Sequence, residues 1–335
     1  MTLPVGKLPP ELLTKLLSHA PILDERIRLG PGVGLDCAVI ELGERLLVIK
    51  TDPITFATDE IGWYAVQVNA NDIATTGAVP RWFLASLLLP EGEATPALTE
   101  VIFEQIYRAC RELGISVIGG HTEITHGLNR PILVGALIGE VDKERLVTPR
   151  GLRPGDRLLL TKGVPIEATA ILGRELLHRL AASLTPAQIE QARNYLYEPG
   201  ISVIRDAQIA LQTGAVHAMH DPTEGGLYTA VWEMAQASGC ALAIDPQTVP
   251  VPELARQACA VAGIDPLGAI ASGALLLATP PQDADYIRLA LASEGIPCAE
   301  IGFVEEGPPA AWQVVQGVRS PLPRPARDEI ARLLD

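Results

Sequence analysis

The sequence predicts a mixed α/β (α+β) fold in two domains, and three observations lead to that prediction. The chain has 335 residues, more than a single domain of roughly 100–200 residues usually contains. Short apolar segments of strand length alternate with longer segments of helical period. Proline, glycine and charged residues gather at residues 148–156, where we expect the boundary between an N-terminal domain, 1–150, and a C-terminal domain, 151–335.

In the N-terminal half, strands are expected where the chain is continuously apolar, and helices where apolar residues recur every three to four positions. The expected strands are 46–50, 115–118 and 131–138, and a helix is expected at about 59–76. A second helix is better defined, because Thr95 can cap its start, Pro96 suits its first position and Gly114 ends it.

The C-terminal half shows the same alternation. The expected strands are 157–161, 215–219, 240–244 and 273–278, and the expected helices are 165–172, 185–195, 222–238 and 281–294, with a short last helix after 321–325. Asp221 and Glu224 have the spacing of a capping box, which predicts that the third of these helices begins at Pro222.

Composition limits the classes of function. Apolar residues make up 48% of the chain, enough to build sizeable cores, although only 4% of residues are aromatic. The formal net charge of −14 argues against a protein that holds nucleic acid by neutralising phosphates. It leaves open a small phosphate-bearing ligand, which backbone N–H groups and Mg²⁺ can bind inside an acidic protein.

The compartment expected from the sequence is the cytoplasm. No apolar stretch approaches the ~18–20 residues needed to span a bilayer, and the N-terminus lacks the pattern of a signal peptide. The five cysteines are odd in number and widely spaced, so we expect reduced thiols, with a zinc site or a nucleophilic cysteine as the alternative.

Two polar clusters stand at the start of the chain. Gly30, Gly32 and Gly34 precede Asp36, and this spacing suits either a plain turn or a close approach of a ligand. Asp36 is correspondingly a turn former or a metal ligand. Asp52 follows the first clear strand, where either a turn residue or a ligand-binding group is common.

A polar stripe interrupts the helix expected at 59–76. Asn69, Asp72 and Thr76 share one face of that helix, and asparagine and aspartate are poor residues for a helix interior. The stripe faces water or lines a polar site.

Two glycine pairs follow. Gly119 and Gly120 precede His121, Thr122 and Glu123, which form either a tight turn or a ligand site; the spacing does not favour zinc. Gly225 and Gly226 weaken the start of the helix at 222–238, which suggests that a group such as a phosphate comes close there.

Together and in this order, the motifs resemble the superfamily of aminoimidazole ribonucleotide (AIR) synthetase, the PurM-like proteins, and they are most similar to its HypE branch of hydrogenase maturation factors. The residues that carry the resemblance cover nearly the whole chain: DCAVI at 36–40, Thr51 with Asp52, NDIATTGAVP at 71–80, GGHT at 119–122, DPTEGGL at 221–227, DPL at 265–267, and Ser272 with Gly273.

The resemblance implies an N-terminal α/β domain whose sheet forms a barrel with its twin in a homodimer, and a C-terminal α+β domain. It implies ATP and Mg²⁺ as cofactors and phosphoryl transfer to an acceptor that the sequence does not identify. It assigns metal binding to Asp36, Asp52 and Asp72, and catalysis to Asp52, Asp72 and His121. The positions that it assigns to cofactor binding are Gly32, Gly34, Thr51, Asn71, Gly119, Gly120, Thr122, Gly225 and Gly226.

The chain departs from the family pattern at three places. His121 and Ser272 stand where the family carries acids, and no cysteine follows Cys298, whereas the HypE branch ends in a cysteine that accepts the carbamoyl group. Two alternatives therefore stay open: a non-catalytic nucleotide-binding scaffold, and a hydrogenase-maturation accessory protein that works with a partner and without its own terminal cysteine.

Overall fold

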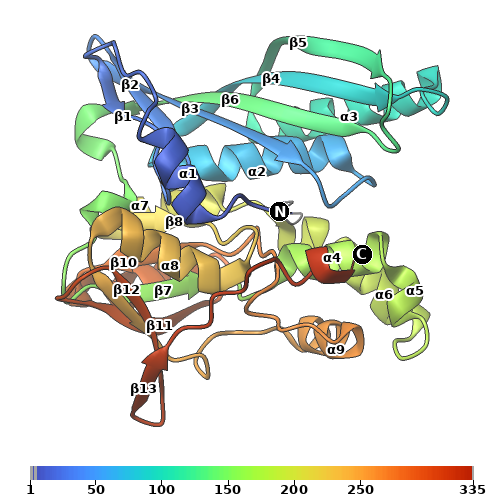
Figure 1. Ribbon diagram of the computed structural model, residues 1–335. Coiled ribbons are helices and arrows are strands. Elements are labelled where there is room, and N and C mark those ends of the chain that lie inside the picture. Colours follow the sequence, from blue (N-terminus) through green and yellow to red (C-terminus); the bar gives the residue numbers. More distant parts are fainter. Residues whose placement is uncertain (1–2, 4–5, 334–335) are drawn as a thin grey trace. The chain divides into compact units, whose positions relative to one another are not determined.

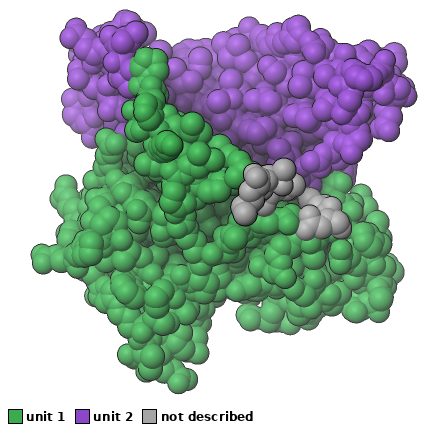
Figure 2. All heavy atoms as spheres, viewed as in Figure 1, with its two compact units in different colours: residues 1–21, 31–36, 147–335 green, residues 22–30, 37–146 purple. Residues whose placement is uncertain are grey.

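The computed structural model describes residue 3 and residues 6–333, which form two compact units (Figure 2). Unit 1 comprises residues 1–21, 31–36 and 147–335, and unit 2 comprises residues 22–30 and 37–146. Residues 1–2, 4–5 and 334–335 lie outside the described residues. The sequence-based statement about a terminal cysteine concerns the last of these ranges.

Unit 2 is a six-stranded sheet with the order β1-β2-β3-β6-β4-β5 (Figure 1). The strands are β1 (Ile27–Leu29), β2 (Ala38–Leu42), β3 (Arg45–Ile54), β4 (Val79–Pro90), β5 (Ser116–Thr125) and β6 (Ile132–Asp142). Two helices, α2 (Ile61–Thr75) and α3 (Pro96–Leu113), lie along one face of this sheet. Even-numbered residues of β3 and odd-numbered residues of β6 face α2, as the alternation of buried and half-buried positions shows.

Local signals explain both helices of unit 2. The Thr95 hydroxyl accepts a hydrogen bond from the Leu98 N–H at 3.2 Å, and Gly114 ends α3 in the left-handed conformation (φ 66°), so the predicted caps are confirmed. All fifteen residues of α2 are buried. The polar stripe of this helix therefore does not face water.

Unit 1 contains a seven-stranded sheet with the order β13-β12-β9-β11-β7-β10-β8. Its strands are β7 (Arg157–Thr161), β8 (Ala218–His220), β9 (Ala241–Ile244), β10 (Leu276–Thr279), β11 (Cys298–Glu305), β12 (Ala310–Val315) and β13 (Val318–Pro321). Its α-helices are α1 (Pro10–Leu17), α4 (Ile166–Arg174), α5 (Leu177–Leu180), α6 (Pro186–Asn194), α7 (Ile204–Thr213), α8 (Gly226–Ser238), α9 (Glu253–Ala262) and α10 (Pro281–Ser293). The core between this sheet and α8 includes Leu158, Leu160 and Val231, all fully buried.

The predicted mixed α/β class is confirmed, but many elements differ from the expectation. Helices α1, α5, α7 and α9 and strands β1, β2, β11, β12 and β13 were not predicted, and three further differences follow. The strand expected at 115–118 continues to Thr125, so Gly119 and Gly120 lie inside β5 and form no turn. The twelve-residue strand β4 was not predicted. Helix α8 begins at Gly226, with Gly225 as a left-handed N-cap and no side-chain cap, so the capping box expected from Asp221 and Glu224 is wrong.

Two further expectations concern cysteines and membranes. The five cysteines, all among the described residues, carry thiols and form no disulfide, and Cys37, Cys110 and Cys259 are buried. Within the described part of the chain, every helix is too short or too polar to cross a bilayer.

Candidate functional site

A lysine and two aspartates form an ion-paired cluster in unit 2. Lys50 and Asp52 are two residues apart on β3, so both side chains point to the face that α2 covers. Lys50 Nζ lies 2.8 Å from Asp72 Oδ2 and 3.2 Å from Asp52 Oδ2. The side chains of Lys50 and Asp72 are 10% and 2% exposed, whereas Asp52 is 33% exposed. One buried ammonium therefore joins the strand to the helix, and Asp52 keeps a side open to solvent.

Neighbouring polar groups hold this cluster in place. The Thr51 hydroxyl donates to the Gly135 carbonyl on β6 at 2.8 Å. Cys37 Sγ donates to the Asp72 carbonyl at 3.3 Å. Asn71 precedes Asp72 in α2 and is fully buried. Asp52 and Asp72 are thus brought together through Lys50, while Thr51 and Asn71 adjoin them along the chain on β3 and α2.

The remaining polar residues of the α2 stripe serve the helix itself. Asn69 Nδ2 donates to the Ala65 carbonyl at 2.8 Å, and the Thr76 hydroxyl donates to the Ile73 carbonyl at 2.7 Å. These bonds to the preceding turn give partners to the Asn69 amide N–H and the Thr76 hydroxyl inside the helix. Of the stripe, Asp72 is the member whose side chain forms an ion pair with another element.

His121 lies on the other face of the sheet. Asp52, Gly135, Ala85 and Gly120 are cross-strand neighbours in one row, which spans three strand spacings, or about 14 Å. His121 is paired with Ser86 in the adjacent row and therefore points away from α2. Its side chain is 68% exposed, and its Nε2 lies 3.0 Å from Glu123 Oε2. Within one copy of the chain, His121 is not brought to Asp52 and Asp72.

The other predicted residues of β5 occupy an exposed edge strand. Gly119, Gly120 and Thr122 are all exposed, in a strand that pairs with β4 alone. Gly120 has a φ of 150°, and a Cβ atom there would lie 2.0 Å from the Ala85 carbonyl oxygen. The glycine is therefore explained by strand packing.

Asp36 takes part in a separate chain of charges in unit 1. His220 Nδ1 lies 3.5 Å from Asp36 Oδ2, and His220 Nε2 lies 3.0 Å from Glu233 Oε2. Lys7 Nζ lies 3.2 Å from the other oxygen of Glu233. His220 is 2% exposed and Glu233 is 12% exposed. Positive and negative groups thus alternate from Lys7 to Asp36.

The charged neighbours of His220 and Glu233 shift the pKa values of both side chains. Burial alone would lower the pKa of His220, but Asp36 and Glu233 outweigh it, and the pKa lies above its usual 6.5. Burial alone would raise the pKa of Glu233, but Lys7 and His220 hold this pKa below its usual value. The arrangement therefore favours a charged His220 between two carboxylates.

The glycines before Asp36 have structural explanations. Gly32 and Leu35 form an isolated β-bridge, so this segment is a tight turn. Gly34 has a φ of 73°, and a Cβ atom there would lie 2.5 Å from the Glu233 carbonyl oxygen. The glycine is needed where this turn packs on α8.

The start of α8 is already occupied by a carboxylate. The Gly225 N–H donates to Asp328 Oδ2 at 2.6 Å, and Asp328 is 1% exposed. A Cβ atom on Gly226 (φ 62°) would lie 2.5 Å from the Leu267 carbonyl oxygen and 2.7 Å from that of Ala269. The close approach that was expected from a phosphate is thus made by the protein's own backbone and by Asp328.

The predicted metal ligands are engaged by cations of the protein itself. Carboxylate oxygens are the ligands that Mg²⁺ prefers. However, Asp52 and Asp72 are paired with Lys50, and Asp36 is paired with His220. No group of three histidine, cysteine, aspartate or glutamate side chains among the described residues could hold a metal ion. A protein-held Mg²⁺ between Asp52 and Asp72 therefore does not fit the site as it stands.

Sequence reasoning missed the charged residues that contact the predicted residues, Lys50, His220 and Asp328, and two that extend the ion pairs beyond His220, Glu233 and Lys7. For Lys50 a signal existed, because a residue two positions before Asp52 on a strand shares its face. The other four come from segments distant in sequence from the residue each contacts, and no local pattern announces them.

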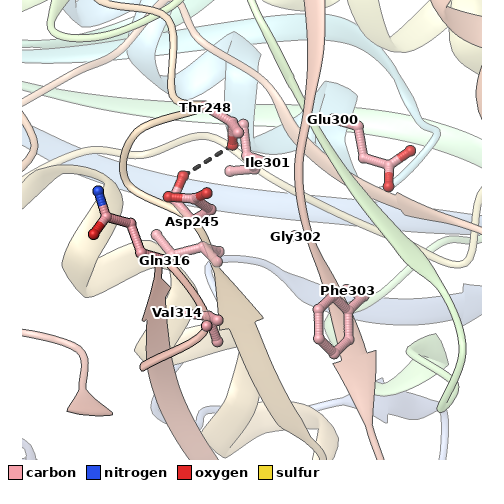
Figure 3. A pocket seen from close by; sticks show the side chains of 10 residues that line it. Asp245, Thr248, Glu300, Ile301, Gly302, Phe303, Val314 and Gln316 are labelled. Carbon is pink, nitrogen blue, oxygen red and sulfur yellow. Dashed lines mark hydrogen bonds between the residues drawn. The ribbon is translucent and has the colours of Figure 1, made fainter. Parts of the chain in front are cut away.

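A hollow of about 400 Å³ opens on the sheet of unit 1 (Figure 3). Its lining comes from β9, β11 and the β12–β13 hairpin, and includes Asp245, Thr248, Glu300, Phe303, Val314 and Gln316. The Thr248 hydroxyl donates to the Asp245 carbonyl at 2.9 Å. None of the lining residues is a predicted site residue.

Both halves of the chain match models of known domains. Residues 34–141 match the N-terminal domain of AIR synthase related protein, and residues 153–314 match its C-terminal domain. The chain is 29% identical over 278 residues to carbamoyl dehydratase HypE of Azotobacter vinelandii, covering 80% of this chain and 78% of that protein. It is 28% identical over 261 residues to hydrogenase expression/formation protein HupE of Azotobacter chroococcum mcd 1, covering 76% and 73%.

A solved structure supports the same relationship at the level of the fold. The hydrogenase maturation protein HypE in complex with ATP matches with a TM-score of 0.72 and 24% sequence identity, covering 95% of this chain and 91% of that one. The PurM-like fold implied by the sequence is therefore confirmed for the single chain. The homodimeric barrel concerns two copies and stays a prediction.

Proposed function

Because the chain belongs to the AIR synthase related protein family, we propose that it is an ATP-dependent enzyme that transfers a phosphoryl group to activate an acceptor. The acceptor is a small molecule or a group held on a protein. The observation that carries the proposal is the cluster in which one buried ammonium, on Lys50, lies within 3.2 Å of both Asp52 and Asp72. Phosphoryl transfer depends mainly on positioned charge, which is what this cluster supplies.

The residues of the cluster have different parts in this proposal. Asp52, a third of whose side chain is exposed, is the carboxylate that a bound ligand can reach. Asp72 is 2% exposed and positions Lys50. Thr51, held on the Gly135 carbonyl, fixes the backbone between Lys50 and Asp52. For the predicted glycines, cofactor binding is proposed on the family resemblance alone. The same holds for metal binding by Asp36.

Mg²⁺ belongs to this proposal as the ion that accompanies the phosphates of ATP. Mg²⁺ keeps several waters and is commonly bound by one or two carboxylates together with substrate phosphates. Asp52 in unit 2 and Asp36 in unit 1, which is 27% exposed, are the predicted ligands that retain some access to solvent. The ion, when bound, neutralises phosphate charge.

The test measures ATP binding and turnover separately. Thermal unfolding is followed with and without ATP and Mg²⁺ together, since a ligand at 100 times its Kd stabilises by about 2.7 kcal/mol. ADP release measures turnover, and we expect Asp52→Asn to lower it about a hundredfold or more. Asp142→Asn, on the same sheet and 53% exposed, is the matched control and leaves turnover unchanged.

The outcomes separate the alternatives. A protein whose unfolding temperature does not respond to ATP and Mg²⁺ contradicts the proposal. A thermal shift without ADP release, in the presence of candidate acceptors, instead supports the non-catalytic nucleotide-binding scaffold.

The proposed enzyme is a homodimer that pairs through the sheet of unit 2. Strand β5 is an exposed edge, and Ile118 and Ile124 on it are 54% and 64% exposed. The face away from α2 carries half-buried apolar side chains, including Ile49 and Ile138, which are paired across β3 and β6. A catalytic role for His121 belongs to this dimer, because within one copy His121 faces away from Asp52.

Sedimentation velocity tests the dimer. We expect the wild-type protein to sediment as a dimer and the variant with both Ile118→Lys and Ile124→Lys to sediment as a monomer. Leu42→Lys, at an exposed position of the same sheet (52%), is the control and stays dimeric. A wild-type monomer at micromolar concentration contradicts the proposal.

The names of the relatives favour a second candidate, an accessory role in hydrogenase maturation. The chain would then work on a group carried by a partner, so it should bind a purified carbamoyltransferase of that maturation system. Isothermal titration measures this binding directly, and the absence of binding with active partner protein excludes the role.

A further inference from the structure

Lys50 stands where the family resemblance places a metal ion. The resemblance assigns Asp52 and Asp72 to Mg²⁺, yet the Lys50 ammonium contacts Oδ2 of both, at 3.2 Å and 2.8 Å. The ammonium is within direct ion-pair distance of each carboxylate. Its side chain is 10% exposed, so it is enclosed and does not extend into solvent.

The burial of Asp72 makes this contact necessary. Asp72 lies in a helix whose fifteen residues are all buried, and its side chain is 2% exposed. A carboxylate removed from water needs a compensating charge or hydrogen bonds. Lys50 supplies that charge from the neighbouring strand, in a register fixed by ten residue pairs between β3 and β6.

The arrangement also fixes the net charge of the cluster. Two carboxylates and one ammonium leave a single negative charge, against two for the carboxylates without Lys50. A divalent ion bound to the same two oxygen atoms would lie beside the ammonium, and like charges at such a distance repel. An ion can occupy the pair when the lysine side chain leaves its place.

We propose that Lys50 is the resident cation of the Asp52–Asp72 pair and that it excludes a free divalent ion from this pair. Asp72 then serves to hold Lys50, and Asp52 alone presents a carboxylate to ligands. This inference concerns the same residues as the proposed function, but it rests on their geometry and predicts a property of the protein without nucleotide.

The test titrates Mn²⁺ into the nucleotide-free protein and measures free Mn²⁺ by electron paramagnetic resonance. The variants are Lys50→Met, the double variant with Lys50→Met and Asp72→Asn, and Asp52→Asn in the wild-type background. Lys143→Met is the matched control, because Lys143 pairs with Glu41 at 2.6 Å on the surface of the same unit.

We expect Lys50→Met to bind one Mn²⁺ at least tenfold more tightly than the wild type, because the two carboxylates become a hard-oxygen site. Adding Asp72→Asn should abolish that gain, and Lys143→Met should not produce it. Asp52→Asn should leave the Mn²⁺ affinity of the wild type unchanged within twofold.

Two results overturn the proposal. One is a folded Lys50→Met protein, with the wild-type circular dichroism spectrum, that binds Mn²⁺ no more tightly than the wild type. The other is a tenfold loss of wild-type Mn²⁺ affinity in Asp52→Asn, which would mean that the pair holds the ion despite Lys50. The measurement on Asp52→Asn decides the question even where Lys50→Met does not fold. Neither measurement depends on ATP turnover.

Discussion

Lys50 on β3 and Asp72 on α2 form an ion pair of 2.8 Å between side chains that are 10% and 2% exposed. Replacing one partner of a buried pair leaves the other charge without compensation, which typically costs about 3–5 kcal/mol. We therefore expect Lys50→Met to lower the free energy of unfolding by about that amount, measured by urea denaturation without metal.

A double-mutant cycle is the control for this prediction. Because the double variant with Lys50→Met and Asp72→Asn removes both charges, it should be more stable than Lys50→Met alone. A loss below about 1 kcal/mol in Lys50→Met would mean that the pair behaves like a surface salt bridge.

Gly226 is needed because two backbone carbonyl groups approach it. Its φ is 62°, and the carbonyl oxygens lie 2.5 Å and 2.7 Å from the position that an added methyl group would take. Gly226→Ala therefore combines backbone strain with a steric clash. We expect it to destabilise the protein by about 3 kcal/mol or more in urea denaturation.

Gly239 provides the matched control at the other end of α8. Its φ is 78°, but no atom lies within 4 Å of an added Cβ, so Gly239→Ala carries the strain without the clash. We expect a cost of about 1–2 kcal/mol there. Equal losses for both variants would show that the carbonyl contacts at Gly226 do not matter.

Local patterns predicted the parts of the fold whose causes are local. Helix α3 follows from Thr95, Pro96 and Gly114, which lie within or beside it. Strand β4 was missed because a central strand is apolar on both faces, and its run from Phe83 to Leu89 has no alternation that separates it from a helix.

The candidate site was predicted in its residue types but not in its contacts. The sequence marks Asp52 as a polar residue directly after a strand that ends at Lys50, and Asp72 as unusual in a helix. That these three meet depends on how α2 packs on β3, which is a tertiary property. The same holds at α8, where Asp328, 103 residues from Gly225, accepts a hydrogen bond from the Gly225 N–H, whereas the capping expected from the local Asp221 is absent.

Asp328 makes stability depend on pH. Burial raises the pKa of this carboxyl from 3.8 to about 7, although the Gly225 and Ile330 N–H groups partly oppose the shift. The folded state therefore binds a proton more tightly than the unfolded state, so the stabilisation is complete below pH 3.8 and is lost as the pH rises through 7. Between about pH 5 and about pH 8 we expect the wild type to lose about 2–3 kcal/mol relative to Asp328→Asn.

Urea denaturation of both proteins at several pH values measures this difference. Asp285→Asn, at a side chain that is 83% exposed, is the control and should follow the wild-type profile. Parallel profiles for the wild type and Asp328→Asn would show that this carboxyl titrates normally in the folded protein.

His220 contributes a second pH dependence, in a higher range. Asp36 and Glu233 raise its pKa above 6.5 against the effect of burial. Its contribution to stability is therefore fully present below pH 6.5 and is lost as the pH rises through its folded-state pKa. His220→Gln removes the cation between two carboxylates, so we expect it to destabilise the protein by about 3–5 kcal/mol at about pH 6 and by clearly less at about pH 9.

The control separates this effect from the general response of the protein to pH. His126 also contacts a carboxylate, Glu91 at 2.6 Å, but its side chain is 93% exposed. Because such a pair is screened by water, His126→Gln should change stability by less than about 1 kcal/mol at either pH. A destabilisation by His220→Gln that is the same at both pH values would mean that His220 is neutral in the folded protein and that its contribution comes from the hydrogen bond with Glu233.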